Sequence, residues 1–477
     1  MSFALSQSLD PNKVFFTRKS ELTKRWDVPY FVPSIVALEK KVQKITPHRL
    51  RDFVLRMSGG STPLTTESET HYTESSDGVP FIRVQNLSTT GQLNLEDCKR
   101  VTRSTHQTLL ERSRLGGGEL LVKITGVGRM AVASVVPEKF EANINQHIAA
   151  IWTDSIKTSE ALASYLNLDF VERLASRRST GGTRPALDYP ALLSLPIIMD
   201  ERVPKLVNAA IQRSNEQLSK ASSLLAEIDG ILLKELGITP KPLPPNTIKS
   251  RIFRRPFSTV VGSRFDAPAN WTELTLKSKI YPCRKLTDLV SINPTTCFDT
   301  ITNSQPVTFV PMEAVSETFG EISENYSRPL SESGSYTTFR EGDLIWAKIT
   351  PCMENGKSAV AEKLVNGFGF GSTEFHVFRP TNSNLKIHYL HALFRMAIVR
   401  EHARLFFGGS SGHQRVDEEF FNRLEIPLPP VEVQEEIVAE IEKVRTAAQA
   451  LRRQAAAELA AAKKSIEAMI LGEAAAK

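Results

Sequence analysis

The stretch GDLIWAKIT at residues 342–350 has an earlier counterpart in the same chain, GELLVKIT at residues 118–125. The same landmarks follow each copy in the same order: a GGTR (181–184) or GHQR (412–415) turn, a Leu-Pro or Ile-Pro step, and a long helical pattern. The offset is constant over the late landmarks, since 415 − 184 and 427 − 196 both give 231. One ungapped alignment therefore carries the turn into the helix, and the sequence predicts a duplicated unit.

Each copy also predicts a mixed α+β head. Runs rich in Val, Ile and aromatic residues, bounded by Gly, Pro, Asn or Ser, are typical of strands. They occur at 79–87, 120–125, 130–136 and 148–152, and again at 307–315, 344–350, 358–361 and 374–378. Helical patches follow at 159–177 and 387–406, and the openings KRWDVPY (24–30) and SRFDAPA (263–269) share an Arg-aromatic-Asp-x-Pro frame.

Two long helices with heptad-like spacing follow the heads. Their apolar residues alternate steps of four and three, which is the pattern of a coiled-coil seam. The predicted seam contains Val207, Ile211, Leu218, Leu225, Ile228 and Leu232 in the first helix and Ile437, Ile441, Val444 and Leu451 in the second. A shift of phase at Leu459 predicts a local stutter. Either helix alone would expose an apolar stripe, so we expect the two to pair within the chain.

The connector between the first helix and the second head favours an antiparallel pair. Residues 237–256 are Pro-rich and basic, typical of a semi-rigid spacer. We therefore predict an α+β protein of two similar heads, separated by an intramolecular antiparallel coiled coil and related by a pseudo-two-fold repeat. The predicted segments are head 1–196, helix 197–236, linker 237–256, head 257–428 and helix 429–477. Helices of ~30–40 residues would hold the heads roughly 45–60 Å apart, more than one turn of B-DNA.

Composition limits the function without deciding it. The net charge of +6 and the pI of about 9.0 permit a polyanionic partner. The four cysteines show no CxxC spacing and no nearby histidine pairing, so we expect no metal site. The chain has no run approaching ~18 uninterrupted apolar residues and no signal-like start, which leads us to expect a cytoplasmic protein without a membrane segment.

Several ordered motifs resemble a known family. They are DLIWAKITPCMENGK (343–357), GSTEFHVFRP (371–380), FVPMEAV (309–315) and IPLPPVEVQEEIVAEI (426–441), with first-half counterparts FIRVQNL (81–87), NINQHIAAIW (143–152) and LPIIMDERVPKLV (195–207). Together they resemble the specificity (S) subunit of type I restriction–modification systems, and the resemblance covers nearly the whole chain.

The resemblance implies a DNA-binding, non-catalytic subunit in host defence. Its two target-recognition domains would each read one half of a bipartite, asymmetric site on double-stranded DNA, with the helices setting the gap. DNA adenine methyltransferase subunits, two copies by this reading, would dock on it, and a motor-nuclease restriction subunit would join for cleavage. No cofactor is expected in this chain, because S-adenosylmethionine would belong to the methyltransferase partner.

Base reading requires Arg, Lys, Asn, Gln or His side chains at groove-facing tips. The loops with glycine at 180–184 and 410–415 are the better candidates, because they bring backbone amides toward an anionic surface. We expect framework roles for Asn145, Gln146 and Glu374. The DNA-binding candidates are Arg83, Gln85, Asn86, Lys123, Arg129, Arg177, Arg178, Thr183 and Arg184 in the first half, and Lys348, Asn355, Lys357, His413, Gln414 and Arg415 in the second.

Two alternatives stay open at this stage. A self-contained DNA methyltransferase would need a cofactor loop, but NGFGFG (366–371) has no following helix, so we expect a turn there. A two-headed protein-interaction scaffold would use the same duplication without touching DNA.

Overall fold

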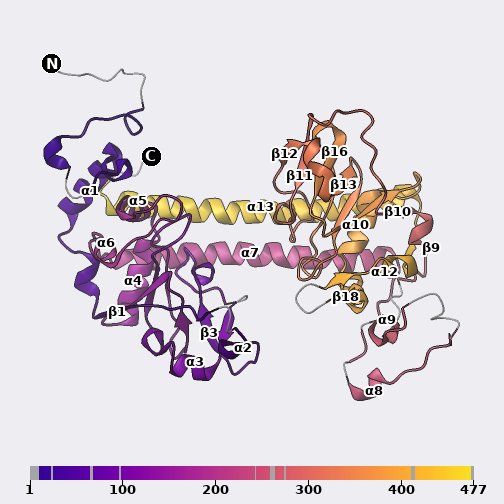
Figure 1. Cartoon of the computed structure of the whole chain (residues 1–477), viewed down its shortest axis with the longest axis horizontal. Helices are drawn as coiled ribbons and strands as arrows, with labels where there is room; N and C mark the ends of the chain where they lie inside the picture. Colours follow the sequence, from indigo (N-terminus) through magenta and orange to yellow (C-terminus); the bar gives the residue numbers. More distant parts are fainter. Residues whose placement is uncertain are drawn as a thin grey trace. The chain divides into compact units, whose positions relative to one another are not determined.

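The computed structural model describes residues 10–22, 25–64, 68–95, 98–241, 243–245, 247–257, 264–272, 276–409 and 414–473. The chain divides into two compact units, Met1–Leu218 with Arg453–Lys477 (unit 1), and Ser219–Arg452 (unit 2). Each unit holds one α+β head and a segment of each long helix, α7 (Arg202–Glu235) and α13 (Val431–Ile470) (Figure 1). The division therefore passes through both helices, and the heads are not separate from them.

Unit 1 contains two four-stranded sheets. The first is antiparallel throughout, in the order β1 (Arg56–Gly59), β8 (Ile148–Trp152), β5 (Leu120–Lys123), β6 (Ala133–Val135). All four residues of β5 are buried, as the Leu-Leu-Val run predicts for a central strand. The second sheet has the order β2 (Tyr72–Thr73), β4 (Lys99–Val101), β3 (Val79–Ile82), β7 (Asn143–Ile144), and its β3–β7 pair is parallel.

Unit 2 repeats the first sheet and alters the second. Its first sheet has the order β10 (Val290–Ile292), β17 (Phe375–Pro380), β14 (Leu344–Ala347), β15 (Ser358–Val360), again antiparallel throughout. Its second sheet has the order β12 (Tyr326–Pro329), β11 (Pro306–Val310), β16 (Phe368–Gly371), β13 (Thr337–Arg340), with β11 and β16 parallel. A two-stranded sheet joins β9 (Cys283–Lys285) to β20 (Glu425–Pro427), and another joins β18 (Phe407–Gly408) to β19 (Arg415–Val416).

Helices complete both heads. In unit 1 they are α1 (Pro33–Ile45), α2 (Ser68–His71), α3 (Arg103–Gln107), α4 (Ile156–Leu166), α5 (Asp169–Arg178) and α6 (Tyr189–Leu193). In unit 2 they are α8 (Ile248–Arg251), α9 (Ala267–Trp271), α10 (Ile387–Arg395), α11 (Ala397–Ala403) and α12 (Glu419–Arg423). The two helical patches expected from the sequence each prove to be a pair of helices, α4 with α5 and α10 with α11. Among the described residues, no helix is both long and apolar enough to span a bilayer.

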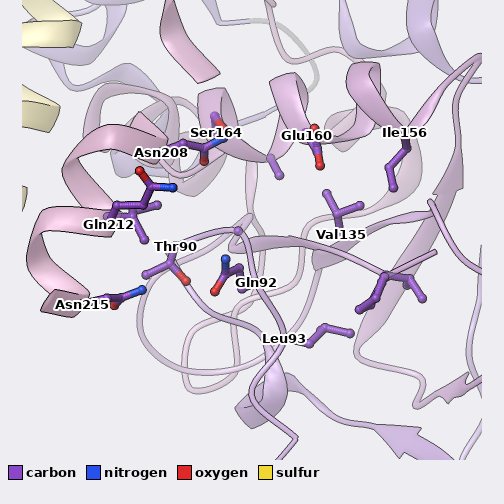
Figure 2. Close-up of a pocket in the computed structure, with 15 residues that line it drawn as sticks. Thr90, Gln92, Leu93, Val135, Ile156, Glu160, Ser164, Asn208, Gln212 and Asn215 are labelled. Carbon is purple, nitrogen blue, oxygen red and sulfur yellow. The ribbon is translucent and has the colours of Figure 1, made fainter. Parts of the chain in front are cut away.

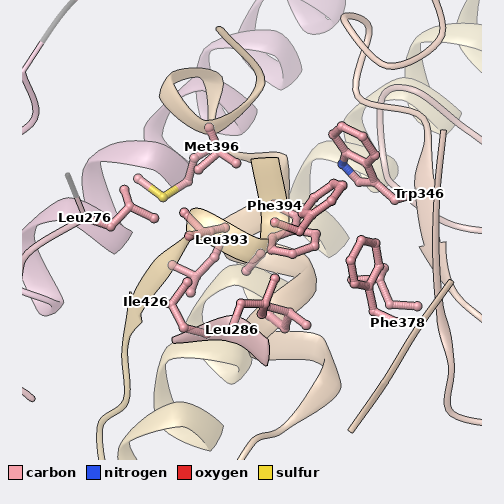
Figure 3. Close-up of a cluster of buried hydrophobic side chains, with 14 of the residues drawn as sticks. Leu276, Leu286, Trp346, Phe378, Leu393, Phe394, Met396 and Ile426 are labelled. Carbon is pink, nitrogen blue, oxygen red and sulfur yellow. The ribbon is translucent and has the colours of Figure 1, made fainter. Parts of the chain in front are cut away.

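The largest core of unit 2 joins the first sheet to its helices. Trp346 of β14, Phe378 of β17 and Phe394 of α10 are at most 1% exposed and pack ring against ring, with centroids 5.0 Å apart for Phe378–Phe394 and 6.4 Å for Trp346–Phe394 (Figure 3). The same cluster includes Leu232 of α7 and Ile437 of α13. Each buried aromatic of this size removes ~150–250 Å² from water, so this cluster fixes the head onto the long helices.

The two long helices pack against each other in each unit. In unit 1 the beginning of α7, with Val207, shares a core with the end of α13, with Ile466. In unit 2 the end of α7 meets the beginning of α13, so the pairing is antiparallel. The predicted seam positions are buried or half-buried except Leu218, which is 38% exposed. Beyond Ala455, the seam continues through Leu459 to Ile466, with the shift of phase expected from the sequence.

One buried hydrogen bond shows that the duplication extends to single atoms. The Tyr165 hydroxyl donates to the carbonyl oxygen of Pro196 at 3.1 Å in unit 1, and the Tyr389 hydroxyl donates to that of Pro427 at 2.9 Å in unit 2. These prolines belong to the Leu-Pro and Ile-Pro steps that are 231 residues apart in the sequence. The same bond therefore ties the head to the entrance of the long helix in both units.

The expectation of a turn at NGFGFG is only half right. Asn366 and Gly367 have positive φ angles of 56° and 74° and form the turn, but the next four residues are strand β16. A Cβ at Gly371 would lie 2.1 Å from the carbonyl oxygen of Val310 on the neighbouring strand. The last glycine of the motif therefore permits close strand packing and is no sign of a cofactor loop.

Candidate nucleic-acid interface

Three loops of unit 1 are interlocked at one end of the first sheet. The Ile124 amide donates to the His147 carbonyl at 2.9 Å, and the Leu187 amide donates to the Ile124 carbonyl at 2.8 Å. Thr183 and Arg184 lie exposed in the last of these loops. Burial and the positive charge of Arg184 both lower the pKa of His147, so that imidazole stays neutral beside the arginine. We call this surface (residues 124–129, 145–147 and 180–187) reading surface 1.

Unit 2 presents the equivalent surface with different side chains. The Lys348 amide donates to the Glu374 carbonyl at 2.9 Å, and the Val416 amide donates to the Lys348 carbonyl at 2.9 Å, which repeats the interlock of unit 1. Here Arg415 donates to the Glu374 carboxylate from Nε at 2.8 Å and from Nη2 at 2.6 Å. Glu374 therefore orients the arginine, in addition to the framework role expected for its backbone. We call this surface (residues 348–350, 372–374 and 414–416) reading surface 2.

Two expected phosphate contacts are wrong. The guanidinium groups of Arg177 and Arg178 are 9% and 8% exposed and both pair with the carboxylate of Glu39 on α1. Arg177 also stacks on the ring of Tyr30, 4.0 Å from its centroid. Both arginines therefore fasten the N-terminal segment to α5, and neither is available to DNA.

Two further candidates are structural for similar reasons. Asn86 is 2% exposed, accepts a hydrogen bond from the Arg83 amide and donates to the Asn94 carbonyl, so it closes a turn. Lys123 is 5% exposed, and its Nζ donates to the Val127 carbonyl at 2.7 Å. Burial lowers the pKa of this lysine. Its position at the end of a buried strand, invisible in the composition of the motif, explains the error.

The remaining candidates divide into surface and tethered residues. Gln85 is exposed, whereas Arg83, Lys348 and Gln414 are half-buried. Three others are held by neighbours: Arg129 donates to Asp169 at 2.5 Å, Asn355 to Glu317 at 3.3 Å, and Lys357 to the Met312 carbonyl at 3.0 Å. His413 lies outside the described residues.

Reading surface 1 also includes two polar residues that sequence reasoning did not place there. Gln146 is exposed, and its side chain accepts a hydrogen bond from the hydroxyl of Thr62. His147 follows it and lies near Arg184. Gln146 was assigned to the framework with the NINQ motif (143–146), but Asn143, Ile144 and Asn145 are buried and Gln146 is exposed. The motif itself carries no signal that separates Gln146 from the three buried residues.

A cleft lies beside the long helix in each unit. In unit 1 it encloses about 520 Å³ between the loop at residues 90–93, helix α4 and helix α7. Figure 2 shows Asn208, Gln212 and Asn215 of α7 on one side, with Thr90 and Gln92 of the loop nearby. In unit 2 a cleft of about 560 Å³ lies between the equivalent loop (319–322), helix α10 and helix α13. The clefts thus occupy equivalent positions.

The linings of the two clefts differ in charge. The polar side chains of the unit 1 cleft are amides, hydroxyls and the carboxylate of Glu160, and about as many of its lining residues are apolar. The unit 2 cleft contains an ion pair between Arg445 and Glu442 at 2.7 Å and a hydrogen bond between His388 and Glu362 at 2.8 Å. Within the described residues, no group of three or more His, Cys, Asp or Glu side chains gathers as a metal site would require.

Parts of the chain are similar in sequence to known proteins. Residues 281–461 match the family model described as "Type I restriction modification DNA specificity domain". The chain is 30% identical over 207 residues to the type I restriction enzyme EcoEI specificity subunit of Escherichia coli, and 31% identical over 207 residues to the EcoAI specificity subunit of the same organism. Each match covers 43% of this chain, and the chain spans only 33% of the length of either relative.

Solved structures give more distant matches. The HsdS subunit from Thermoanaerobacter tengcongensis is 15% identical, with 90% of this chain and 96% of that chain covered and a TM-score of 0.32. A chain from the study titled "Structural basis underlying complex assembly and conformational transition of the type I R-M system" is also 15% identical, with 89% and 96% covered and a TM-score of 0.40. The similarity to type I restriction modification DNA specificity domains therefore rests on residues 281–461 and on the two Escherichia coli specificity subunits.

Proposed function

We propose that this chain is the specificity subunit of a type I restriction–modification complex, in which each unit reads one half of a bipartite DNA site. The observation that carries the proposal is the repeated interlock behind reading surfaces 1 and 2, which presents Arg184 in one unit and Arg415 in the other. Identical backbone frames with different side chains are what two unequal half-sites require, because base edges are read by side chains.

The proposal includes two docked methyltransferase subunits. The equivalent clefts beside α7 and α13 support it, since a duplicated surface can hold two copies of one partner in related orientations. On this proposal the chain itself is not an enzyme. The partner supplies adenine methylation with S-adenosylmethionine, and a motor-nuclease subunit joins for cleavage. The antiparallel helix pair would then set the distance between the half-sites.

The test is to change each reading surface separately. Arg184→Gln and Arg415→Gln should each relax base preference in one half-site and leave the other unchanged, because a good bidentate contact discriminates by ~1–3 kcal/mol. Mapping methylated adenines in cells that carry the chain and its methyltransferase partner gives both half-sites in one measurement. Loss of preference in both half-sites with either variant would contradict one-unit, one-half-site reading.

Matched controls lie at the far end of each first sheet. Lys157 is exposed in α4, which follows the opposite end of β8 from His147. Lys285 is exposed in β9, just before β10, whose first residue pairs with Pro380 at the opposite end of β17 from Glu374. Lys157→Gln and Lys285→Gln should leave both half-sites unchanged.

The two alternative functions have their own tests. Binding of S-adenosylmethionine by the purified chain alone would favour the self-contained methyltransferase. A methylation pattern that stays the same without this chain would favour the protein scaffold.

A further inference from the structure

The Arg-aromatic-Asp-x-Pro frame found in both halves of the sequence forms the same structure in both units. Arg25 pairs with Asp27 at 2.5 Å and donates to the carbonyl oxygens of Arg178 and Ser179 at 2.7 and 2.8 Å. Asp27 is the N-terminal residue before a short 3-10 helix with proline in its first turn. The arginine thus joins the start of this helix to the end of α5, an arrangement that we call arginine clasp 1.

Unit 2 contains the same arrangement, arginine clasp 2. Arg264 pairs with Asp266 at 2.6 Å and donates to the carbonyl oxygens of Phe406 and Phe407 at 2.8 and 3.3 Å. Asp266 caps α9 by accepting a hydrogen bond from the Ala269 amide at 3.1 Å. Four hydrogen-bonding groups therefore recur in the same roles: the guanidinium, the carboxylate and two backbone carbonyls. This explains why the motif has the same sequence pattern in two halves that otherwise differ.

The residue between the arginine and the aspartate has no such structural use. Trp26 is 76% exposed and Phe265 is 70% exposed. A single exposed aromatic is common on protein surfaces. Here the exposed ring stands at the same place in both units, on a backbone that the clasp holds from both sides. A rigid aromatic repeated in this way is typical of a binding contact.

The position of the rings favours DNA as the partner. Clasp 1 ends at residues 178 and 179, directly before the loop with Thr183 and Arg184. Clasp 2 ends at residues 406 and 407, at the start of β18, whose second residue Gly408 pairs with Arg415. Each ring therefore lies next to a reading surface. The clasp arginines are already neutralised by their aspartates, so other side chains must supply the positive charge.

A basic segment packs against each clasp. Residues 13–19 (KVFFTRK) contain three basic and no acidic side chains, and residues 249–255 (KSRIFRR) contain four and none. In unit 1, Phe16 and Tyr30 line one groove, and Arg25 lies over the Tyr30 ring at 4.7 Å. In unit 2, Arg255 donates to the Asn270 carbonyl at 2.9 Å, which places this segment on α9. Basic side chains around an exposed ring complement the charge of a phosphate backbone.

We propose that Trp26 and Phe265 make a second contact with duplex DNA, independent of base sequence, at the edge of each half-site. The ring would pack against a deoxyribose or wedge between two base pairs, and the adjacent basic segment would bind phosphates. This inference rests on the proposed function, because it requires that the reading surfaces face DNA. It goes beyond that function by assigning affinity to the clasps and base choice to the reading surfaces.

The test compares affinity with specificity. In the complex with its methyltransferase partner, Trp26→Ala should weaken binding to DNA about tenfold, by the same factor for a cognate duplex and for one with a changed half-site. Trp26→Phe, which keeps a ring, should stay within about twofold of the wild type. Phe265→Ala should behave like Trp26→Ala. Leu109→Ala and Ile280→Ala remove side chains that are 52% and 60% exposed in units 1 and 2, and should change nothing.

Fluorescence of the full chain alone provides an independent readout. The chain has four tryptophans, of which Trp346 is 1% exposed, Trp152 and Trp271 are half-buried, and Trp26 is 76% exposed. Stacking on a base should quench the signal of Trp26 when DNA is added, and Trp26→Phe should abolish that quenching.

Three outcomes would overturn the inference. Unchanged DNA affinity in Trp26→Ala and Phe265→Ala would remove the contact. If either variant instead loses bound methyltransferase copies in native mass spectrometry while its affinity for DNA is unchanged, the rings are a protein-docking site. A loss confined to the cognate duplex would make them base-reading residues. A wild-type complex without any sequence preference would instead defeat the proposed function itself, so the two failures are distinguishable.

Discussion

The first sheets of the two units are built alike, whereas the second sheets share three strands, β4-β3-β7 and β12-β11-β16, and differ in the fourth. The order β1-β8-β5-β6 corresponds to β10-β17-β14-β15, with every neighbour antiparallel in both. In the second sheets, β3–β7 corresponds to β11–β16, but unit 1 adds β2 beyond β4 while unit 2 adds β13 beyond β16. The units are therefore equal next to the long helices and unequal in the layer added to them.

This difference separates two requirements. The first sheet packs on the long helices through one continuous core in each unit, so its geometry determines how each head is mounted. The second sheet and the loops can vary without disturbing that mounting. A shared acidic residue keeps one contact and differs in another. Glu119 and Asp343 each accept a hydrogen bond from the amide three residues earlier, but Asp343 also pairs with Arg379 at 2.7 Å, whereas Glu119 also accepts from the Gly117 amide.

The largest effect is expected at Glu39, where a substitution should destabilise unit 1 and leave unit 2 unchanged. In unit 1 this carboxylate is 8% exposed and holds Arg177 and Arg178 together. Glu39→Ala leaves two buried guanidinium groups without a counter-ion, and removal of one member of a buried pair costs ~3–5 kcal/mol. Hydrogen exchange measured separately for each unit should become faster in unit 1 and stay unchanged in unit 2.

A surface pair of unit 1 provides the control. Lys41 and Glu473 form an ion pair at 2.7 Å with exposed side chains, a kind of contact worth ~0–1 kcal/mol. Lys41→Ala should therefore leave exchange in unit 1 nearly unchanged. Equal opening of both units in Glu39→Ala would show that the units do not unfold separately.

The matched tyrosines sharpen the comparison. Tyr165→Phe and Tyr389→Phe each remove a hydroxyl that donates to a proline carbonyl, which loses about 1 kcal/mol and somewhat more if that carbonyl stays dry. Because the two bonds are equivalent, we expect equal losses, each confined to its own unit. Urea titration followed by hydrogen exchange measures both, and a loss in one unit only would mean that the two frames are not energetically equivalent.

Low pH should destabilise unit 2 more than unit 1, the opposite of the effect expected for Glu39→Ala. Burial lowers the pKa of three histidines in unit 2, His376, His391 and His402. In the described part of unit 1, it lowers the pKa of one histidine, His147. The unfolded chain takes up protons on these imidazoles as the pH falls through about 6.5, while the folded chain resists. Stability is therefore lost as the pH falls, and more of it in unit 2.

Buried carboxyl groups do not reverse this order. Burial raises the pKa of Asp229 in unit 2 and of Glu467 in unit 1, and each such group stabilises its unit as the pH falls. Each unit thus has one carboxyl group whose contribution to stability partly offsets that of its histidines as the pH falls. Hydrogen exchange at pH 7 and pH 5 should show unit 2 opening first, and His391→Gln should reduce that difference. Earlier opening of unit 1 would contradict the prediction.

Much of the fold was predictable because its signals are periodic. The apolar steps of four and three identified both long helices and even the shift at Leu459, and the buried runs identified β5 and β14. The second sheets were harder, because strands as short as β7, with two residues, carry no pattern of their own. The helix α1 was also missed, although its Glu39 is essential to the packing of α5.

The candidate site was predicted by residue type better than by orientation. Arg184 and Arg415 are both exposed, and their contact with DNA stays a prediction. Lys123 and Lys348 occur in the same KIT triplet, yet Lys123 is the last residue of β5 while Lys348 follows the last residue of β14. A shift of one residue along a strand turns a side chain to the other face, so a shared motif did not imply a shared environment.

The smallest effect tests how Arg184 and Arg415 are held. Glu374 orients Arg415 with two hydrogen bonds, whereas the equivalent position in unit 1 is His147, which stays neutral near Arg184. Glu374→Ala removes a negative charge and this constraint, so non-specific DNA binding should rise by a few-fold and base preference at the unit 2 half-site should fall. His147→Ala should leave the unit 1 half-site nearly unchanged. Binding to duplexes altered in one half-site at a time measures both, and equal effects of the two substitutions would mean that the carboxylate has no special part in setting the arginine.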